Sequence, residues 1–414
     1  MAHVTTSTNP PKTINRSVII LILAALIALG PLTIDMYLPA FPDIEQDLAT
    51  TNARVVLTMT SYFFGIAIGQ LFYGPLMDRF GRKGPMLIGL SLYILASFAS
   101  CLATNVDALI WARLVQALGG CGGMVASRAM VRDLFPVKET AKVFSILILI
   151  MGIAPIIGPA IGGVVVEHLG WQAIFVILGA FCLLLWMVIF FWTPESKGPD
   201  TGISLRPWQV LRKYVEVGRN PTFITYGLAG SFGMAGLFAY IAGSPWVVME
   251  YLGYSESEFG WVFGINAMGF IAGSQINRLA LRQFSTEQVT LFSGISILLV
   301  SAGLVIGVIL GLLPGIGILV FLFLLLFSLG FLAPNTMALS LAPFSRMAGS
   351  ASALVGTIRM LAGAIATALV SGLADDTPIP MALVIGGFSL LSFLCIVLLR
   401  GKTAASGSLE EKAA

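Results

Sequence analysis

Long apolar segments alternate with short polar ones along the chain, from about Val18 to about Leu399. A hydrocarbon core of about 30 Å needs about 20 helical residues per crossing, so an apolar run of that length predicts a membrane-spanning helix. Twelve such runs fit, at residues 17–38, 54–75, 84–103, 107–130, 141–165, 171–192, 221–243, 257–278, 288–311, 316–339, 350–372 and 379–399. The pattern therefore predicts an all-α integral membrane protein with twelve transmembrane helices.

The longest polar connection lies between the sixth and seventh predicted spans and is rich in proline and glycine. It ends in a basic, amphipathic stretch near Trp208 that is typical of a segment on a membrane surface. The series Gly74, Asp78 and Arg79 after span two recurs with the same spacing after span eight, as Gly273, Asn277 and Arg278, and a further arginine follows each series, Arg82 and Arg282. Two pseudo-symmetric six-helix bundles are predicted, with the parts 1–16 (tail), 17–192 (first half), 193–220 (linker), 221–399 (second half) and 400–414 (tail).

Composition excludes a soluble globular protein, since 57% of the 414 residues are apolar and only 10% are charged. Soluble domains carry roughly 25% charged residues. All but three of the 23 Lys and Arg residues fall in the tails or in the connections on one side of the predicted membrane, which is the cytoplasmic side by the positive-inside rule. The sequence thus predicts a multi-pass protein of a bacterial-type cytoplasmic (inner) membrane, with both termini cytoplasmic and the first span retained.

The sequence carries no recognisable enzyme chemistry. The four cysteines lie inside apolar runs without paired spacing, so neither a disulfide nor a metal site is predicted. No phosphate-binding loop and no Ser/His/Asp arrangement is present. We therefore expect a protein that is not an enzyme, that needs no cofactor, and that binds neither nucleotide nor nucleic acid.

The most distinctive local motif is the short cytoplasmic loop after span two, which runs Gly74-Pro-Leu-Met-Asp78-Arg79-Phe-Gly81-Arg82-Lys83. Glycines permit a tight turn, and Asp78 can pair with Arg82 or lie at the positive N-terminal end of a helix from the other half. We expect this loop to act as a latch at the inner gate. An ordinary basic cytoplasmic loop is the alternative.

Two charged residues stand inside predicted spans of the first half, Asp35 in span one and Arg113 in span four. A charge in hydrocarbon costs several kcal/mol unless it faces a polar cavity or a partner. The two lie about 5 Å and about 9 Å from the outer ends of their spans, so we expect them to share one layer of a cavity. A carboxyl whose surroundings change between conformations changes its proton occupancy, which predicts proton coupling. The alternative is a static ion pair that only fixes helix packing.

Span five is rich in glycine and proline, with Gly152, Pro155, Gly158, Pro159, Gly162 and Gly163 within twelve residues. Gly158 and Gly162 lie on one helical face, and small residues at this spacing permit close helix contact. The prolines bend the helix. Simple packing between membrane helices is the alternative to a functional role.

These motifs resemble those of a known transporter family. The loop after span two resembles the first signature loop of the major facilitator superfamily, and the pattern of span five resembles the signature of its drug:proton antiporters. The string from Asp35 to Pro42 is similar to the bicyclomycin- and chloramphenicol-resistance exporters, the Bcr/CflA group. The segment after Arg113 departs from the family pattern, because Ala117 stands where glycine is usual. The resemblance implies that Asp133, at the inner end of span four, joins the latch.

The resemblance further implies a proton-coupled multidrug or small-molecule efflux antiporter that works by alternating access and confers antibiotic resistance. Its partners would be small-molecule drugs, protons and the lipid bilayer. The first alternative is a proton-coupled importer of a small metabolite on the same fold, against which the pattern of span five argues. A membrane-embedded enzyme or a sensor is a second alternative that no motif supports.

Several polar and aromatic residues in the spans are candidates for the substrate cavity, although each could instead pack between helices. Arg359 is a second intramembrane cation, about 14 Å into span eleven, without an obvious acid in the second half. It is expected to face the cavity and bind an acidic or carbonyl-rich substrate or compensate Asp35, and a helix-packing role is the alternative. The other candidates are Tyr37, Tyr62, Gln70, Phe238, Tyr240, Asn266 and Asn335.

Overall fold

A computed structural model describes residues 16–200, 202, 207–344 and 347–411. Over these residues the chain is helical, and no strand occurs among them. The helices are α1 (Arg16–Asp35), η1 (Leu38–Ala40), α2 (Phe41–Asp47), α3 (Asn52–Phe80), α4 (Lys83–Cys101), α5 (Val106–Leu134), α6 (Val137–Leu169), α7 (Gln172–Trp192), α8 (Pro207–Gly218), α9 (Pro221–Pro245), η2 (Trp246–Tyr251), α10 (Glu256–Ala280), α11 (Thr286–Ile309), α12 (Gly315–Leu341), α13 (Ala348–Gly372) and α14 (Ile379–Glu411). The predicted all-α membrane fold is confirmed.

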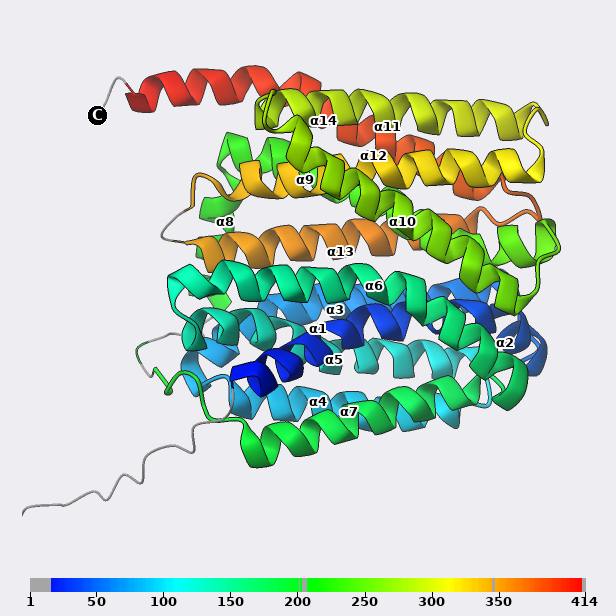
Figure 1. Cartoon of the computed structure of the whole chain (residues 1–414), viewed down its shortest axis with the longest axis horizontal. Helices are drawn as coiled ribbons and strands as arrows, with labels where there is room; N and C mark the ends of the chain where they lie inside the picture. The colour runs from blue at the N-terminus through cyan, green and yellow to red at the C-terminus, as the bar shows by residue number, and fades with distance from the viewer. Residues whose placement is uncertain (1–15, 201, 203–206, 345–346, 412–414) are drawn as a thin grey trace, which may run out of the picture.

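Twelve of these helices are long, and eleven of them are apolar enough to cross a membrane by length and composition, within the described residues. The exception is α10, whose sequence includes Asn266, Gln275 and Asn277. Figure 1 nevertheless shows α10 running obliquely along the molecule beside α6 and α12, and it packs against both. The polar residues of α10 therefore lie in a helix that shares the bundle with the eleven apolar ones.

The long helices lie side by side, with α1 to α7 in one bundle and α9 to α14 in the other (Figure 1). Within the first bundle α3 packs on α5 and α4 on α7, and within the second α9 packs on α14 and α10 on α12. Two pairs, α3 with α13 and α6 with α10, form the main contacts between the bundles. The short helix α8 occupies the linker, where the basic amphipathic stretch was predicted.

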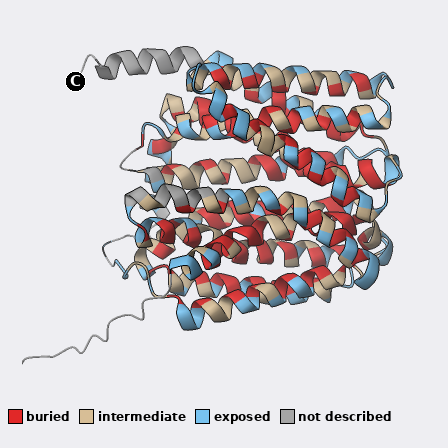
Figure 2. Cartoon of the chain, viewed as in Figure 1, coloured by how far each residue is buried: buried red, intermediate tan, exposed pale blue. Residues whose placement is uncertain are grey.

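Small polar side chains line the contact between α3 and α13. The Ser371 hydroxyl donates to the Ala53 carbonyl at 2.7 Å, and the hydroxyls of Thr60 and Thr367 lie 2.8 Å apart. Both contacts lie near the N-terminal end of α3, which the positive-inside rule predicts to be the outer end, and outer and inner are named by this predicted orientation. Buried residues concentrate where the two bundles meet, and exposed ones line the rim (Figure 2). The outer part of the interface between the bundles is thus closed.

Candidate functional site

Arg113 is enclosed by aromatic rings in the interior of the first bundle. Its side chain is completely buried, and its guanidinium carbon lies 4.5 Å from the ring centre of Tyr37 and 4.4 Å from that of Tyr62. Nη1 donates to Gln116 Oε1 at 2.7 Å and Nη2 donates to the Thr33 carbonyl at 3.2 Å. Cation–π contacts and two hydrogen bonds therefore replace part of the hydration of this cation, while its Nε is buried without a hydrogen-bond partner among the described residues.

Asp35 is the last residue of α1 and is only 3% exposed. Its carboxyl group makes no hydrogen bond or ion pair with any part of the chain that the structure describes. The static ion pair of Asp35 with Arg113, which was the alternative, is not observed in this conformation, and Arg113 is surrounded by rings and acceptors instead. An ionised carboxylate buried without a partner costs several kcal/mol, so this environment accommodates the neutral acid more readily.

The glycines of span five lie in α6, where they allow the chain to approach Asp35 closely. A Cβ added to Gly158 would lie 2.8 Å from Cβ of Asp35, and one added to Gly162 would lie 2.9 Å from both Cα and the carbonyl carbon of Met36. Gly163 faces the other bundle, 2.7 Å from the Glu256 carbonyl oxygen by the same measure. Gly152 is less crowded, with its nearest neighbour atoms at 3.7 Å. Pro155 and Pro159 lie inside the helix between these contacts.

Aromatic candidates for the cavity meet where the two bundles face each other. The rings of Phe63 in α3 and Phe238 in α9 lie 4.5 Å apart, and Tyr240 stacks on Phe263 at 5.3 Å. Asp35 lies close enough to interact electrostatically with the hydroxyls of Tyr62 and Tyr240. The structure thus groups Asp35, Tyr62, Phe238 and Tyr240 around the interface.

The polar candidates divide into two sets. Asn266 lies beside Tyr240, and its Nδ2 is buried without a hydrogen-bond partner. Gln70 in α3 packs against Gly356 of the other bundle. Asn335 instead donates to Asn277 Oδ1 at 2.8 Å, within the second bundle. Asn335 is therefore occupied in holding α12 to α10 and does not join the group around Asp35.

The loop after α3 forms a charged network at the inner end of the first bundle. Arg82 is 8% exposed, and its Nη1 lies 2.7 Å from Asp78 Oδ1 while its Nε lies 2.9 Å from Asp133 Oδ2. Gly81 has a φ of +88°, a conformation that favours glycine. Of the two arrangements open to Asp78, the pairing with Arg82 is the one observed. By contrast, a side chain at Gly74 would meet nothing within 4 Å, and Arg79 directs its guanidinium over the Phe80 ring.

The linker supplies a residue to this network that the sequence did not reveal. Glu195 Oε1 accepts from the backbone N–H of Arg82 at 2.7 Å, and Oε2 accepts from that of Lys83 at 3.1 Å. A carboxylate at this position satisfies free N–H groups and complements the dipole at the start of α4. Lys197 Nζ lies 3.6 Å from Asp78. In the sequence, the only indication of this contact is that an acid, Glu195, follows soon after span six.

Replacing Asp78 by asparagine should slow turnover by about tenfold and leave the concentration for half-maximal transport within about twofold. The change removes one of the two carboxylates that hold Arg82, at a site remote from the aromatic interface. Initial transport rates over a range of substrate concentrations measure both quantities. Glu139→Gln, which breaks the exposed pair with Arg16, is the control. Equal turnover in Asp78→Asn and wild type would rule out the latch.

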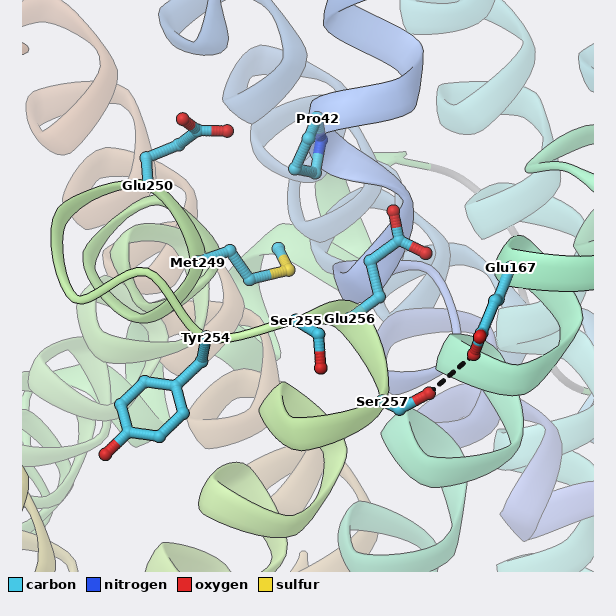
Figure 3. A pocket seen from close by; sticks show the side chains of 8 residues that line it. All are labelled: Pro42, Glu167, Met249, Glu250, Tyr254, Ser255, Glu256 and Ser257. Atoms are coloured by element: carbon cyan, nitrogen blue, oxygen red, sulfur yellow. Dashed lines mark hydrogen bonds between the residues drawn. The ribbon is translucent and has the colours of Figure 1, made fainter.

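Acidic residues gather at the outer face, where α6 of one bundle meets α10 of the other (Figure 3). A pocket of about 500 Å³ is lined by Glu167, Glu250 and Glu256, among others. Ser257 donates to Glu167 Oε2 at 2.7 Å across this contact. Burial raises the pKa of Glu256, at the outer end of α10, to about 7, and the charges of Asp43 and Glu167 add to the rise.

The closed outer face should weaken as pH rises from about 4.5 to about 7 and change little above that. In the closed form Glu256 has a pKa of about 7 in place of 4.5, so the closed form binds the proton more tightly than an open, solvated one and loses this advantage as Glu256 ionises. Electron paramagnetic resonance distances between spin labels at the outer ends of α3 and α13 would report the opening. Glu256→Gln should flatten the profile, and Asp107→Asn should preserve it. An identical profile in Glu256→Gln would contradict this assignment.

Comparison with known proteins agrees with this architecture. A family model described as Major Facilitator Superfamily matches residues 21–367. A bicyclomycin resistance protein homolog of Haemophilus influenzae is 32% identical over 94% of this chain and 98% of its own length. Multidrug resistance protein D of Escherichia coli is 28% identical over 91% of this chain and 94% of its own. The resemblance to bicyclomycin-resistance proteins that the sequence predicted is confirmed.

A solved structure shows the same fold. The crystal structure of a D-xylose–proton symporter superposes with a TM-score of 0.70 at 15% sequence identity, covering 92% of this chain and 97% of that one. At this identity the likeness concerns the fold alone. The family match over most of the chain, the relatives at about a third identity and the two six-helix bundles agree. This chain is a member of the Major Facilitator Superfamily.

Proposed function

We propose that this protein is a proton-coupled exporter of small organic molecules that works by alternating access in the cytoplasmic membrane, with both termini in the cytoplasm. The observation that carries the proposal is Asp35, a buried carboxyl without a partner, held against α6 at Gly158. The names of the relatives, which are bicyclomycin, chloramphenicol and multidrug resistance proteins, favour drug-like cargo and outward transport.

The geometry suggests how protonation and closure are linked. With the outer face closed, Asp35 packs against Gly158 in surroundings that suit a neutral acid. When the outer face opens, water reaches Asp35, and the carboxyl takes a proton from outside after the cargo has left. Closure then carries the proton inward, and its release to the cytoplasm prepares the site for the next molecule. Arg113 is held between the rings of Tyr37 and Tyr62 and keeps the positions of α1, α3 and α5 fixed in this cycle.

The latch and the glycines of α6 have separate tasks in this cycle. Arg82, Asp78 and Asp133 hold the inner ends of the first bundle together, so that the bundle moves as one body. Gly158 and Gly162 let α1 and α6 approach closely at the outer gate. The protein needs no cofactor in this scheme, since one proton moving down 100 mV supplies about 2.3 kcal/mol.

The test is transport by everted membrane vesicles that contain the overproduced protein. Chloramphenicol and a panel of other antibiotics should be accumulated when respiration acidifies the vesicle interior, and nigericin or a protonophore should abolish accumulation. Addition of a transported compound should in turn release protons from the vesicles. Accumulation only in right-side-out vesicles would assign uptake and refute export. Transport that ignores the proton gradient would refute coupling.

A further inference from the structure

Basic side chains without an ion pair occur in two different settings among the described residues. Arg359 lies near the middle of α13, and its Nε is buried with no hydrogen-bond partner. Arg212, Lys213 and Arg219 are instead exposed, on α8 or directly after it. The N–H of Arg219 donates to the Val215 carbonyl at 3.0 Å, so Arg219 continues the last turn of α8. The exposed cations thus belong to a single helical surface.

α8 carries an apolar stripe on the side that faces away from the protein. Trp208, Leu211 and Val215 are 74%, 50% and 42% exposed, and their spacing places them along one face of the helix. Val217, on the opposite face, is fully buried against the second bundle. An exposed apolar stripe with tryptophan and neighbouring basic residues is typical of a helix that lies in the interface of a bilayer.

Contacts with the long helices place α8 at the level of the inner membrane interface and not beyond it. The Tyr214 hydroxyl donates to the Leu71 carbonyl at 3.4 Å, and Leu71 lies about 14 Å before the inner end of α3. Val217 clusters with Ala351 and Val355, in the first turns of α13. Figure 1 shows α8 at this end of the molecule, running across the direction of the long helices. The helix therefore lies along the plane of the inner leaflet and contacts both bundles.

The border of the apolar stripe is positively charged. Arg212 and Arg219 each follow a residue of the stripe by one helical turn, so both lie beside it. Lys213 adds a third cation, and Glu216 is the only acid of α8. Guanidinium groups bind phosphate oxygens through their planar fork of donors, and basic side chains at a membrane surface are attracted to anionic lipids. The charge of this surface is therefore complementary to an anionic headgroup.

We propose that α8 is a binding surface for anionic phospholipids of the inner leaflet. The apolar stripe enters the boundary between headgroups and acyl chains, and Arg212 and Arg219 bind the anionic headgroups. A zwitterionic lipid would cover the stripe equally well, but its own cationic group would leave the excess positive charge of the surface without compensation. This inference goes beyond the proposed export function and uses only the proposed orientation.

Fluorescence quenching by labelled lipids provides the test, with the full chain in nanodiscs of equal parts phosphatidylglycerol and phosphatidylcholine. A nitrobenzoxadiazole fluorophore is attached at Leu211→Cys in a background without the four native cysteines, and a nitroxide is carried by the acyl chains of one lipid or the other. Both lipids should quench, and phosphatidylglycerol should be enriched at the fluorophore by about fivefold or more, since each basic residue near the surface contributes about fivefold in affinity. Raising the salt concentration should weaken the preference.

Three variants identify the residues responsible. Arg212→Gln combined with Arg219→Gln leaves Lys213 and Glu216 in balance, so the enrichment should fall to about one while both lipids still quench. Arg212→Lys combined with Arg219→Lys keeps the charge and should keep most of the enrichment, which separates a charge effect from a folding effect. Arg282→Gln, at an exposed arginine of another inner connection, is the control and should behave as the wild type.

Equal quenching by the two lipids in the wild type, or an unchanged preference in the double glutamine variant, would overturn the proposal. Absence of quenching by either lipid would place α8 in water and contradict it as well. The measurement needs no proton gradient, so its outcome is independent of the vesicle assay. Proton-driven export by a protein without lipid preference would refute the lipid surface alone, and a clear preference in a protein that exports nothing would leave it standing.

Discussion

Proton-driven export should be abolished when Asp35 is replaced by asparagine, while the protein still folds and inserts. Asparagine has nearly the same shape as the neutral acid, and the carboxyl makes no hydrogen bond or ion pair with the described residues that would be lost. The variant cannot carry a proton at this position. One proton per neutral molecule supplies about 2.3 kcal/mol at 100 mV, which corresponds to an accumulation of about 50-fold, and in Asp35→Asn this ratio should fall to about one.

Accumulation in everted vesicles and drug susceptibility of cells without their own efflux pumps measure this effect. Asp107→Asn is the matched control, because Asp107 is an exposed outer acid that pairs with Arg54. The amount of protein in the membrane should be equal in all three proteins. Wild-type accumulation by Asp35→Asn would assign proton coupling to another residue.

The second large effect is expected for Gly162→Ala, which should prevent the outer face from closing. The added methyl group would lie 2.9 Å from Cα and the carbonyl carbon of Met36, and it would meet the Met36 carbonyl oxygen as well. These are backbone atoms, so no side-chain rotation relieves the overlap. Overpacking of this kind costs about 1–3 kcal/mol, which lowers the ratio of closed to open protein by about 5-fold to about 150-fold.

Labelling of a cysteine placed at Thr367 reports this opening. Thr367 is fully buried and contacts Thr60 of the other bundle, so in the closed form a membrane-impermeant maleimide added from outside should not reach it. In a background without the four native cysteines, Gly162→Ala should increase the labelling rate and abolish transport. Gly387→Ala is the control, since a Cβ there meets nothing within 4 Å. Unchanged labelling with full transport would show that α1 and α6 tolerate the methyl group.

The helices of this fold could be predicted from the sequence because the length of an apolar run determines whether it can cross a membrane. Each predicted span has a helix in the structure, and even α10 follows the twelve-span pattern despite its lower apolarity. The loop from Asp78 to Arg82 was also readable, since its partners are four residues apart on one turn. Both the helices and the pairing of Asp78 with Arg82 were therefore predictable from residues that are close together in the sequence.

The surroundings of the buried charges could not be predicted in the same way. The aromatic enclosure of Arg113 combines Tyr37, Tyr62 and Phe175, three residues that are distant in sequence. Opposite charges alone suggest Asp35 as the partner of Arg113, and the structure has these rings around Arg113 instead. Glu195 likewise reaches the start of α4 from the linker, 113 residues from Arg82. Each of these depends on how helices pack, which no local pattern encodes.

The polar character of α10 has a consequence for the biogenesis of the protein. A segment that contains Asn266, Gln275 and Asn277 partitions into lipid less readily than its neighbours do. Asn277 finds its partner Asn335 only in α12, which is synthesised later. We therefore expect α10 to remain near the translocation machinery until α12 emerges, so that chains truncated after α11 expose α10 to quality-control proteases although every more apolar helix before it has already been inserted.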